Sequence, residues 1–458
     1  MKPSETSKLH IELIIAFVLY LGLSAYLIYI HEPWRDEIHA WLMAKNMSIP
    51  ELIRFSRHEG HPFLWHILLM PFAKTGAPVW TMNALSSLIV AIAAFFFLFR
   101  TKLHSVLKNV ILFTIPFLYI FSAIARNYCL VLLGVVLVGV LYEKRYEKPV
   151  LYSLPIMLLV FSHALAWGFV AGLTIMFHVT ELIKGIAGKS KLEKKSVRGI
   201  VIGFVGIALC SVFAVLTLAG ERNSGYMTYR TPDTYRMVIC LVAIAVLLLA
   251  YSLIFSRETI KESLVILTTN LFMVLIILTV YSALILEREM LVNAFLLFWI
   301  IACWKKPVWK PLVSWGIAFV FPLIFLGSGL QYYNTLKVDR TWYYSGAQQM
   351  AAYINAFLPE EEEILVDSGV ICQTIVPYTD KKLYDILYQA EIENSLYHVF
   401  DIEGSEEAVK DIENHSEYKG KYIICAFAFE EYDTDRFEQI FETDQPIENE
   451  KYTLYYIH

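Results

Sequence analysis

The sequence predicts a polytopic α-helical membrane protein of about 11–13 transmembrane helices, followed by a small C-terminal α/β domain outside the cytoplasm. Three observations predict this class. Of the 458 residues, 57% are hydrophobic and only 18% are charged, and the mean hydropathy is +0.52, whereas about a quarter of a soluble chain is charged. Apolar runs near 20 residues recur, and a helix of that length crosses a bilayer. Beyond about residue 330 the chain becomes acidic and its apolar runs become short.

Eleven apolar runs are predicted to cross the membrane. They cover residues 11–30, 79–98, 109–126, 129–142, 149–162, 164–183, 199–220, 236–255, 264–285, 290–304 and 310–330. The first run follows a basic start and has no small-residue cleavage site, so we expect a retained signal-anchor span. The run "FLWHILLMPF" at 63–72 is too short to span. We interpret it as a juxtamembrane or re-entrant helix, or as half of a broken pair, which would add two spans.

The basic loops predict how the chain is oriented. If the N-terminus is cytoplasmic, the strongly basic loops all fall on the cytoplasmic side, as the positive-inside rule requires. These loops cover residues 100–108, 142–149, 183–199, 256–262 and 305–310. The arginine-containing loop 221–236 is the exception. We therefore expect a multi-pass protein of the plasma (inner) membrane with an extracytoplasmic C-terminal domain.

Two domains are predicted. Residues 1–330 form the membrane domain, which includes an extracytoplasmic first loop at 31–78 with short juxtamembrane helices. Residues 331–458 form the α/β domain, because "EEEILVDSGV" at 361–370 and "GKYIICAFAF" at 420–429 are short apolar runs typical of buried strands. "SGAQQMAAYINAFL" at 345–358 has helical spacing and precedes Pro359.

Polar residues beside the predicted spans gather on the outer side of the membrane. Asp36-Glu37 follows the first span, and "DEIHAWLMAK" has the apolar spacing of an amphipathic helix. The pair is either a solvated loop pair or a catalytic base, because a carboxylate can take a proton from an acceptor hydroxyl or amine. The stretch that contains Glu59 and His61 is either a helix start, with Gly60 as the hinge and Pro62 near the first turn, or it adds a second carboxylate and an imidazole. In the second case Asp36, Glu59 and His61 would together hold a metal ion.

Arginines occur at two further outer positions. Arg126 either snorkels to the interface or binds a phosphate, since its planar guanidinium matches phosphate oxygens. Arg288 either binds a phosphate in the same way or pairs with Glu287 and Glu289. His163 is either a satisfied polar group in a helix hairpin or a hydrogen-bonding partner of a phosphate or sugar.

Taken together, these pieces resemble the GT-C glycosyltransferases, and in particular the bacterial branch of protein O-mannosyltransferase-like and lipid A aminoarabinose transferase-like enzymes. The resemblance covers residues 1–330. It is carried by "RDE" at 35–37, "GHPFLWH" at 60–66, "ARNY" at 125–128 and "EREM" at 287–290. The chain departs from the commoner pattern in having His-Pro-Phe where two prolines often stand, which bears on the local helix start.

The resemblance implies transfer of a sugar from a polyprenyl-phosphate donor to a glycan, lipid or protein acceptor outside the cytoplasm. It implies that Asp36 is the catalytic base with Glu37 beside it, that Arg126, Tyr128 and Arg288 hold the carrier phosphate, and that Glu59, His61 and His163 form the acceptor or metal side. The cofactor is unknown, and a divalent metal ion is left open. No nucleic-acid partner is expected.

Two other functions fit the same sequence. A transporter or flippase of a lipid-linked or anionic substrate would use the arginines as binding sites, although it would place charge near the bilayer midplane. A non-catalytic membrane assembly factor would work through its α/β domain and would not need Asp36.

Overall fold

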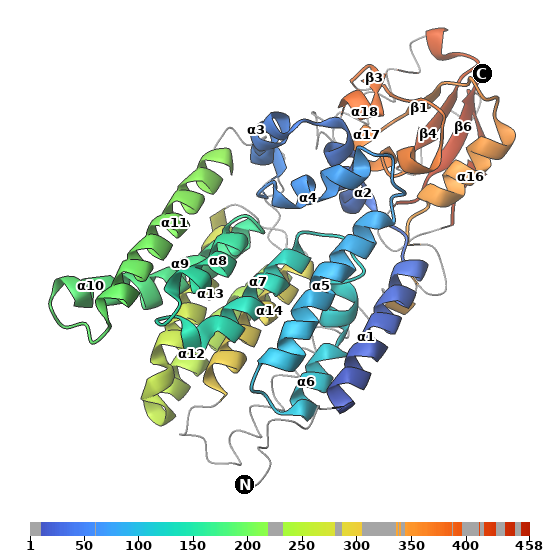
Figure 1. Ribbon diagram of the computed structural model, residues 1–458. Coiled ribbons are helices and arrows are strands. Elements are labelled where there is room, and N and C mark those ends of the chain that lie inside the picture. Colours follow the sequence, from blue (N-terminus) through green and yellow to red (C-terminus); the bar gives the residue numbers. More distant parts are fainter. Residues whose placement is uncertain are drawn as a thin grey trace. The chain divides into compact units, whose positions relative to one another are not determined.

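The protein is described by a computed structural model in which two compact units can be recognised (Figure 1). The described residues are 11–59, 61–218, 232–279, 286–304, 336–337, 339, 344–386, 388–395, 412, 416–426, 436–444 and 450–458. The first unit, here the helical unit, comprises Met1–Leu27, Glu59–Trp65 and Ala84–Tyr332. The second, here the mixed unit, comprises Ile28–His58, His66–Asn83 and Tyr333–His458. Most of the first loop therefore packs with the C-terminal residues, whereas the predicted domains assign that loop to the membrane part.

Apolar helices make up most of the chain up to residue 304. They are α1 (Ile11–Ile30), α5 (Thr81–Arg100), α6 (Ser105–Leu112), η2 (Pro116–Ile120), α7 (Tyr128–Leu141), α8 (Pro149–Val160), η4 (Ala164–Ala166), α9 (Trp167–Leu173), η5 (Thr174–Val179), α10 (Thr180–Ile186), α11 (Lys194–Leu218), α12 (Pro232–Phe255), α13 (Ile260–Thr279) and α14 (Leu286–Cys303). Among the described residues, five stretches are long and apolar enough to cross a membrane: Ile11–Ile30, Thr81–Arg100, Ala164–Ile186, Lys194–Leu218 and Arg257–Leu278. The chain is thus a multi-pass membrane protein, as predicted.

The remaining predicted spans have different outcomes. Shorter apolar helices occupy Pro149–Val160, Val238–Ile254 and Leu291–Cys303, and the predicted span 310–330 lies outside the described residues. The predicted span 109–126 is wrong as a single helix. Helix α6 ends at Leu112, a π-helical turn covers Pro116–Ile120, and turns follow up to Asn127. Pro116 lacks the N–H that would continue the α-helical pattern, which explains the break.

The segment after the first loop contains a helix too short to cross a bilayer. Helix α4 (Leu64–Ala73) has ten residues and contains Pro71. At about 1.5 Å per residue it is about 15 Å long, half of a hydrocarbon core. The prediction of a short helix here is confirmed, and whether it lies beside the membrane, re-enters it or forms half of a broken pair stays a prediction.

Two glycines let α9 approach α13 within the helical unit. Gly168 and Gly172 are four residues apart and so lie on one face of α9, a small-residue pattern typical of close membrane-helix packing. A Cβ atom on Gly168 would lie 2.6 Å from Cβ of Phe272. A Cβ atom on Gly172 would lie 3.0 Å from the backbone oxygen of Val265. Because the neighbour of Gly172 is backbone, it cannot rotate away.

Replacing Gly172 by valine is therefore expected to destabilise the helical unit by about 1–3 kcal/mol, the usual cost of overpacking. The measurement is thermal unfolding of the full-length protein in detergent. Gly22→Val in α1 is the matched control, because a Cβ there has no described atom within 4 Å. Equal shifts for the two variants would contradict the assigned contact.

The mixed unit contains a six-stranded sheet of order β3-β2-β1-β4-β6-β5. Its strands are β1 (Ile364–Val366), β2 (Leu383–Asp385), β3 (Ala390–Glu391), β4 (Tyr422–Cys425), β5 (Phe437–Glu442) and β6 (Thr453–Ile457). Strand β1 runs parallel to β2 and β4, whereas β6 is antiparallel to β4 and β5. The α/β prediction is confirmed, and β1, β4 and helix α16 (Ala347–Phe357) fall where the sequence predicts them.

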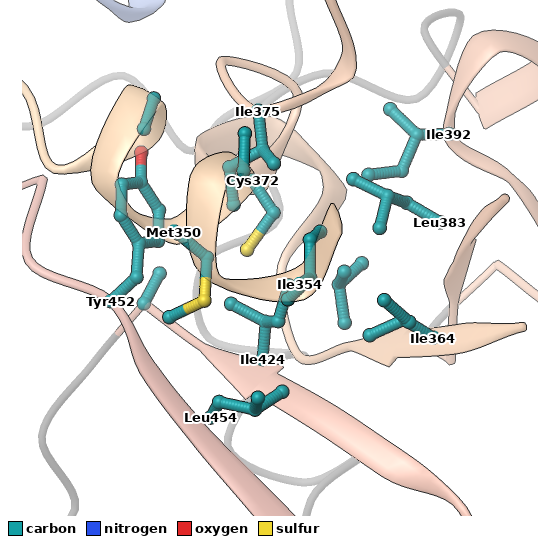
Figure 2. Packing of buried hydrophobic residues seen from close by; sticks show 14 of the residues in the cluster. Met350, Ile354, Ile364, Cys372, Ile375, Leu383, Ile392, Ile424, Tyr452 and Leu454 are labelled. Atoms are coloured by element: carbon teal, nitrogen blue, oxygen red, sulfur yellow. The ribbon is translucent and has the colours of Figure 1, made fainter. Parts of the chain in front are cut away.

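Apolar side chains cover both faces of this sheet. Figure 2 shows one cluster, in which Met350 and Ile354 of α16 lie with Ile364, Ile424 and other buried side chains. Leu365 and Ile423, which alternate with those strand residues, join a second cluster. A strand whose neighbouring residues point to opposite faces and are all buried needs cover on both sides. The central strands β1 and β4 are therefore interior elements of the mixed unit.

The first loop is helical, as predicted. Helices α2 (Arg35–Asn46) and α3 (Ile49–Glu59) occupy it. The expectation that α2 is amphipathic is wrong, because every residue from Glu37 to Ala44 is buried. Eight consecutive residues cover more than two turns, so all faces of this stretch are enclosed.

Candidate functional site

The first turn of α2 carries the two predicted catalytic carboxylates, Asp36 and Glu37. A hydrogen bond between the Trp34 backbone and the Glu37 side chain lies at its start. The Trp34 carbonyl accepts from the backbone N–H groups of Glu37 and Ile38, both at 3.0 Å. The Glu37 carboxylate in turn accepts from the backbone N–H of Trp34 at 3.2 Å. The second bond is the Glu half of a capping box, in which the side chain at the third helical position accepts from the N–H of the residue before the helix. The indole of Trp34 has no acceptor atom for the other half. The start of α2 is thereby fixed by Glu37.

Glu37 is fully buried and its oxygens are engaged. Besides Trp34, His31 Nε2 lies 2.8 Å from Oε2, and Asn83 Nδ2 donates to Oε1 at 2.8 Å. The exposed fraction of Glu37 is 0%. A carboxylate with three protein donors and no exposure is suited to holding the loop, not to meeting a substrate.

Asp36 has the opposite environment although it is the adjacent residue. Its side chain is 28% exposed and pairs with Arg35, whose Nε lies 3.3 Å from Oδ1. The backbone N–H of Arg35 donates to the carboxylate of Glu450 at 2.8 Å. Asp36 therefore combines a fixed backbone with a carboxylate that solvent or a ligand can reach.

His31 lies between two carboxylates and was not among the predicted site residues. Its Nε2 is 2.8 Å from Glu37 and its Nδ1 is 2.8 Å from Asp339. Burial by itself lowers the pKa of His31, but the two carboxylates outweigh it and raise the pKa well above the ordinary value. The sequence signal for His31 was its place directly after an apolar span; nothing in the sequence pointed to Asp339.

Glu32 connects the same loop to the C-terminal residues. Its carboxylate accepts from the backbone N–H groups of Ser345 at 3.2 Å and Gln348 at 3.1 Å. Gln348 lies in the first turn of α16, where backbone N–H groups lack helical partners. Burial raises the pKa of Glu32 to about 7, against the lowering effect of these two bonds.

Glu450 is a second buried carboxyl group that was not among the predicted site residues. Burial raises its pKa to about 8, although Ser345 and Arg35 act in the opposite direction. The pKa of Glu450 in the folded protein exceeds its ordinary value of 4.5. The stabilisation that results is complete below pH 4.5. This contribution is lost as the pH rises through about 8.

Glu450→Gln is therefore expected to make the mixed unit less sensitive to pH. Glutamine resembles the protonated acid and keeps an acceptor for Arg35. The variant's unfolding temperature, relative to wild type, should rise as the pH increases from 5 to 8. Glu442→Gln is the control, because Glu442 is partly exposed and pairs with Lys451. A constant difference across this pH range would show that Glu450 does not titrate there.

A second group of predicted residues comes together in the helical unit. The guanidinium of Arg126 lies over the Tyr128 ring, 5.6 Å from its centroid. The Tyr128 ring stacks on His163 with centroids 5.4 Å apart, and His163 lies 4.4 Å from His61. Three separate sequence motifs therefore form one contiguous group, which we call the Arg126–His61 cluster: Arg126, Tyr128, His163 and His61.

Local structure fixes the members of this cluster. Asn127, just before α7, donates through Nδ2 to the backbone oxygen of Ser162 at 2.8 Å, which joins the two turns. The Nδ1 atom of His163 accepts from the backbone N–H of Leu165 at 3.0 Å. A neutral His163 must then carry its proton on Nε2. Tyr128 and His163 are 3% and 2% exposed, respectively, whereas Arg126 and His61 are half-buried.

This composition suits an anionic, hydroxyl-bearing ligand. A guanidinium binds phosphate oxygens, and aromatic rings with imidazoles provide stacking surfaces and hydrogen bonds for a sugar. Through the contact between Tyr128 and His163, the cluster joins the residues predicted to bind the donor phosphate, Arg126 and Tyr128, to two residues of the predicted acceptor side. The roles of the four residues remain predictions.

Two predicted site residues have side chains outside the described part of the structure. Glu59 is the last residue of α3, and Arg288 lies in the first turn of α14. Asp36 belongs to the mixed unit and the Arg126–His61 cluster to the helical unit, so a shared site stays a prediction. Within the described residues, no three His, Cys, Asp or Glu side chains form a group that could hold a metal ion.

Comparison of the chain with known protein families, with curated protein sequences and with solved structures finds no match.

Proposed function

We propose that the chain is an integral-membrane glycosyltransferase that moves a sugar from a polyprenyl-phosphate donor to an acceptor on the extracytoplasmic face. The observation that carries the proposal is the contrast between adjacent carboxylates. Glu37 is fully buried with three donors, while Asp36 is 28% exposed on the same fixed helical turn. Such an arrangement positions one reactive carboxylate with little conformational freedom.

The reaction uses the residues in distinct roles. The Asp36 carboxylate takes the proton of the acceptor hydroxyl or amine as that atom bonds to the anomeric carbon. The bond between the anomeric carbon and the phosphate oxygen breaks, and its electron pair leaves with polyprenyl phosphate. The Arg126 guanidinium offsets the charge that develops on this phosphate. Arg288 assists at the phosphate, and His61, His163 and Glu59 bind sugar or acceptor hydroxyls.

The membrane setting supports this assignment. A lipid-linked donor keeps its chain in the bilayer and its phosphate at headgroup depth, so its enzyme needs a cation beside apolar helices. Arg126 meets that need, since it lies two residues before α7 and is half-buried. The distribution of basic loops favours an extracytoplasmic position for this end of α7, with the N-terminus in the cytoplasm.

A doubly labelled donor tests the proposal. Full-length protein in vesicles is given polyprenyl-phosphate sugars labelled with ³H in the sugar and ³²P in the phosphate, together with a cell-envelope extract as acceptor. A transferase separates the two labels, because the bond between sugar and phosphate breaks. If the labels cross the bilayer together, the protein is a transporter. If no donor in the panel is consumed or moved, the glycosyltransferase class is wrong.

A further inference from the structure

The first loop is attached to the C-terminal residues at several points within the mixed unit, and these points surround Asp36. Glu32 bonds to the start of α16, and the backbone of Arg35 bonds to Glu450. One turn further along α2, His39 Nδ1 lies 2.9 Å from the side-chain oxygen of Gln373. Glu32 and Arg35, which precede Asp36, and His39, three positions after it, are therefore all bonded to C-terminal residues.

The most deeply buried of these attachments is ionic. His31, Glu37 and Asp339 all have 0% exposed side chains, and both imidazole nitrogens lie 2.8 Å from carboxylate oxygens. A neutral imidazole has one N–H and one lone pair, so it would turn a lone pair toward one of the carboxylates. The imidazolium donates at both nitrogens and satisfies both partners. With both carboxylates ionised, the geometry therefore favours the charged ring.

We infer that His31, Glu37 and Asp339 form a charged clamp that fixes the N-terminal turn of α2 to the C-terminal region, and that Asp339 is thereby a positioning residue for Asp36. The role assigned to Asp36 rests on the proposed function, but the clamp itself does not. Breaking one partner of a buried ionic group leaves an uncompensated charge, which is costly. The clamp is thus the attachment whose loss should free α2.

The other groups that face His31 are compatible with a charged ring. The Tyr344 ring meets the imidazole edge-on, with centroids 5.1 Å apart. Glu32 is the neighbouring acid, and the charge on His31 acts on it. Asn83 and the backbone of Trp34 donate to Glu37 from its other side. Around His31 and its two carboxylates there are therefore one further acid, Glu32, and the neutral groups of Tyr344, Asn83 and Trp34.

The clamp has a predictable pH dependence. The pKa of His31 is raised in the folded protein, so the clamp's stabilisation is complete below the ordinary histidine value of about 6.5 and is lost as the pH rises through the folded pKa. Asp339→Asn removes one of the two carboxylates that raise this pKa. The variant should therefore lose the clamp at a lower pH than the wild-type protein.

Hydrogen–deuterium exchange of α2 tests the inference on the full-length protein in detergent. Asp339→Asn is expected to raise exchange of the α2 amides at least 10-fold, after correction for intrinsic rates, and to move the onset of exchange to lower pH. Glu393→Gln is the matched control, because it breaks the exposed Lys45–Glu393 pair that also ties α2 to the C-terminal residues. Exposed pairs contribute little, so its α2 should remain protected.

The outcomes separate the clamp from the proposed function. Unchanged α2 exchange in Asp339→Asn at every pH overturns the clamp, whatever the activity. If sugar transfer is observed, Asp339→Asn should lower kcat more than it raises KM for the donor. If wild-type protein transfers no sugar but α2 loosens in the variant, the clamp stands and the glycosyltransferase proposal fails. Asparagine keeps the volume and an acceptor oxygen, so this variant is preferred to alanine for folding.

Discussion

Replacing Asp36 by asparagine is expected to lower kcat for sugar transfer by about 10²- to 10⁴-fold, the usual contribution of a general base. Asparagine keeps the size of the side chain and an acceptor for Arg35, but it cannot take a proton. Because Asp36 is partly exposed and Glu37 makes the side-chain bond at the start of α2, the variant should fold normally. Initial rates at saturating donor, with unfolding temperatures measured in parallel, give this result.

Two other acidic residues serve as comparisons for Asp36. Glu51→Gln removes a partly exposed carboxylate from α3 and should leave kcat unchanged. Glu37→Gln should instead lower the unfolding temperature. His31 and Asn83 each bond to a different oxygen of Glu37, and an amide has only one oxygen. If Asp36→Asn retained wild-type kcat while folding normally, Asp36 would not be the base.

The second large effect is expected for Arg126→Ala. A charge-assisted hydrogen bond contributes about 1.5–3 kcal/mol, which corresponds to about 10- to 150-fold in kcat/KM for a donor with a phosphate group. The variant should both raise KM for the donor and lower kcat, since the guanidinium contacts the phosphate before and during bond cleavage. Steady-state kinetics over a range of donor concentrations measures both.

Lysine and a distant arginine provide the controls for Arg126. Arg126→Lys should retain part of the activity, because lysine keeps the charge without the planar fork. Arg57→Ala removes an exposed arginine of α3 and should change neither constant. A polyprenyl phosphate without sugar should inhibit the wild-type protein and lose affinity for Arg126→Ala. Equal inhibition of both would place the phosphate elsewhere.

Local patterns predicted much of the fold because they depend on neighbouring residues. Apolar run length predicted the spanning helices, and short apolar runs predicted β1 and β4. The pattern was insufficient where a single residue changes the backbone, as at Pro116, which interrupts the predicted span 109–126. It also missed that α2 is buried all round, since its polar residues are matched by partners distant in the sequence.

Part of the candidate site could also be predicted. The sidedness of the loops indicated that His61, Arg126, Tyr128 and His163 would share a membrane face, and the structure brings all four into one cluster. The sequence could not distinguish Asp36 from Glu37, because the difference arises from contacts and not from residue type.

Long-range polar pairs were beyond the reach of the sequence. Asp339 lies 308 residues from His31, and Glu450 lies 415 residues from Arg35. No periodicity or local motif relates such residues, so their pairing depends on how the whole mixed unit folds. The burial of Glu32 and Glu450 could not be predicted either. A glutamate is usually exposed unless it is paired, and the partners of these two are distant in the sequence.

The most direct test of the account compares release of polyprenyl phosphate by the wild-type protein, Asp36→Asn and Arg126→Ala, each as full-length protein in the same vesicles and with the same donor. We expect the wild-type protein to release polyprenyl phosphate in proportion to the sugar transferred, and both variants to lose most of this release while remaining folded. Full release by both variants would contradict the assignment of Asp36 and Arg126 to the reaction.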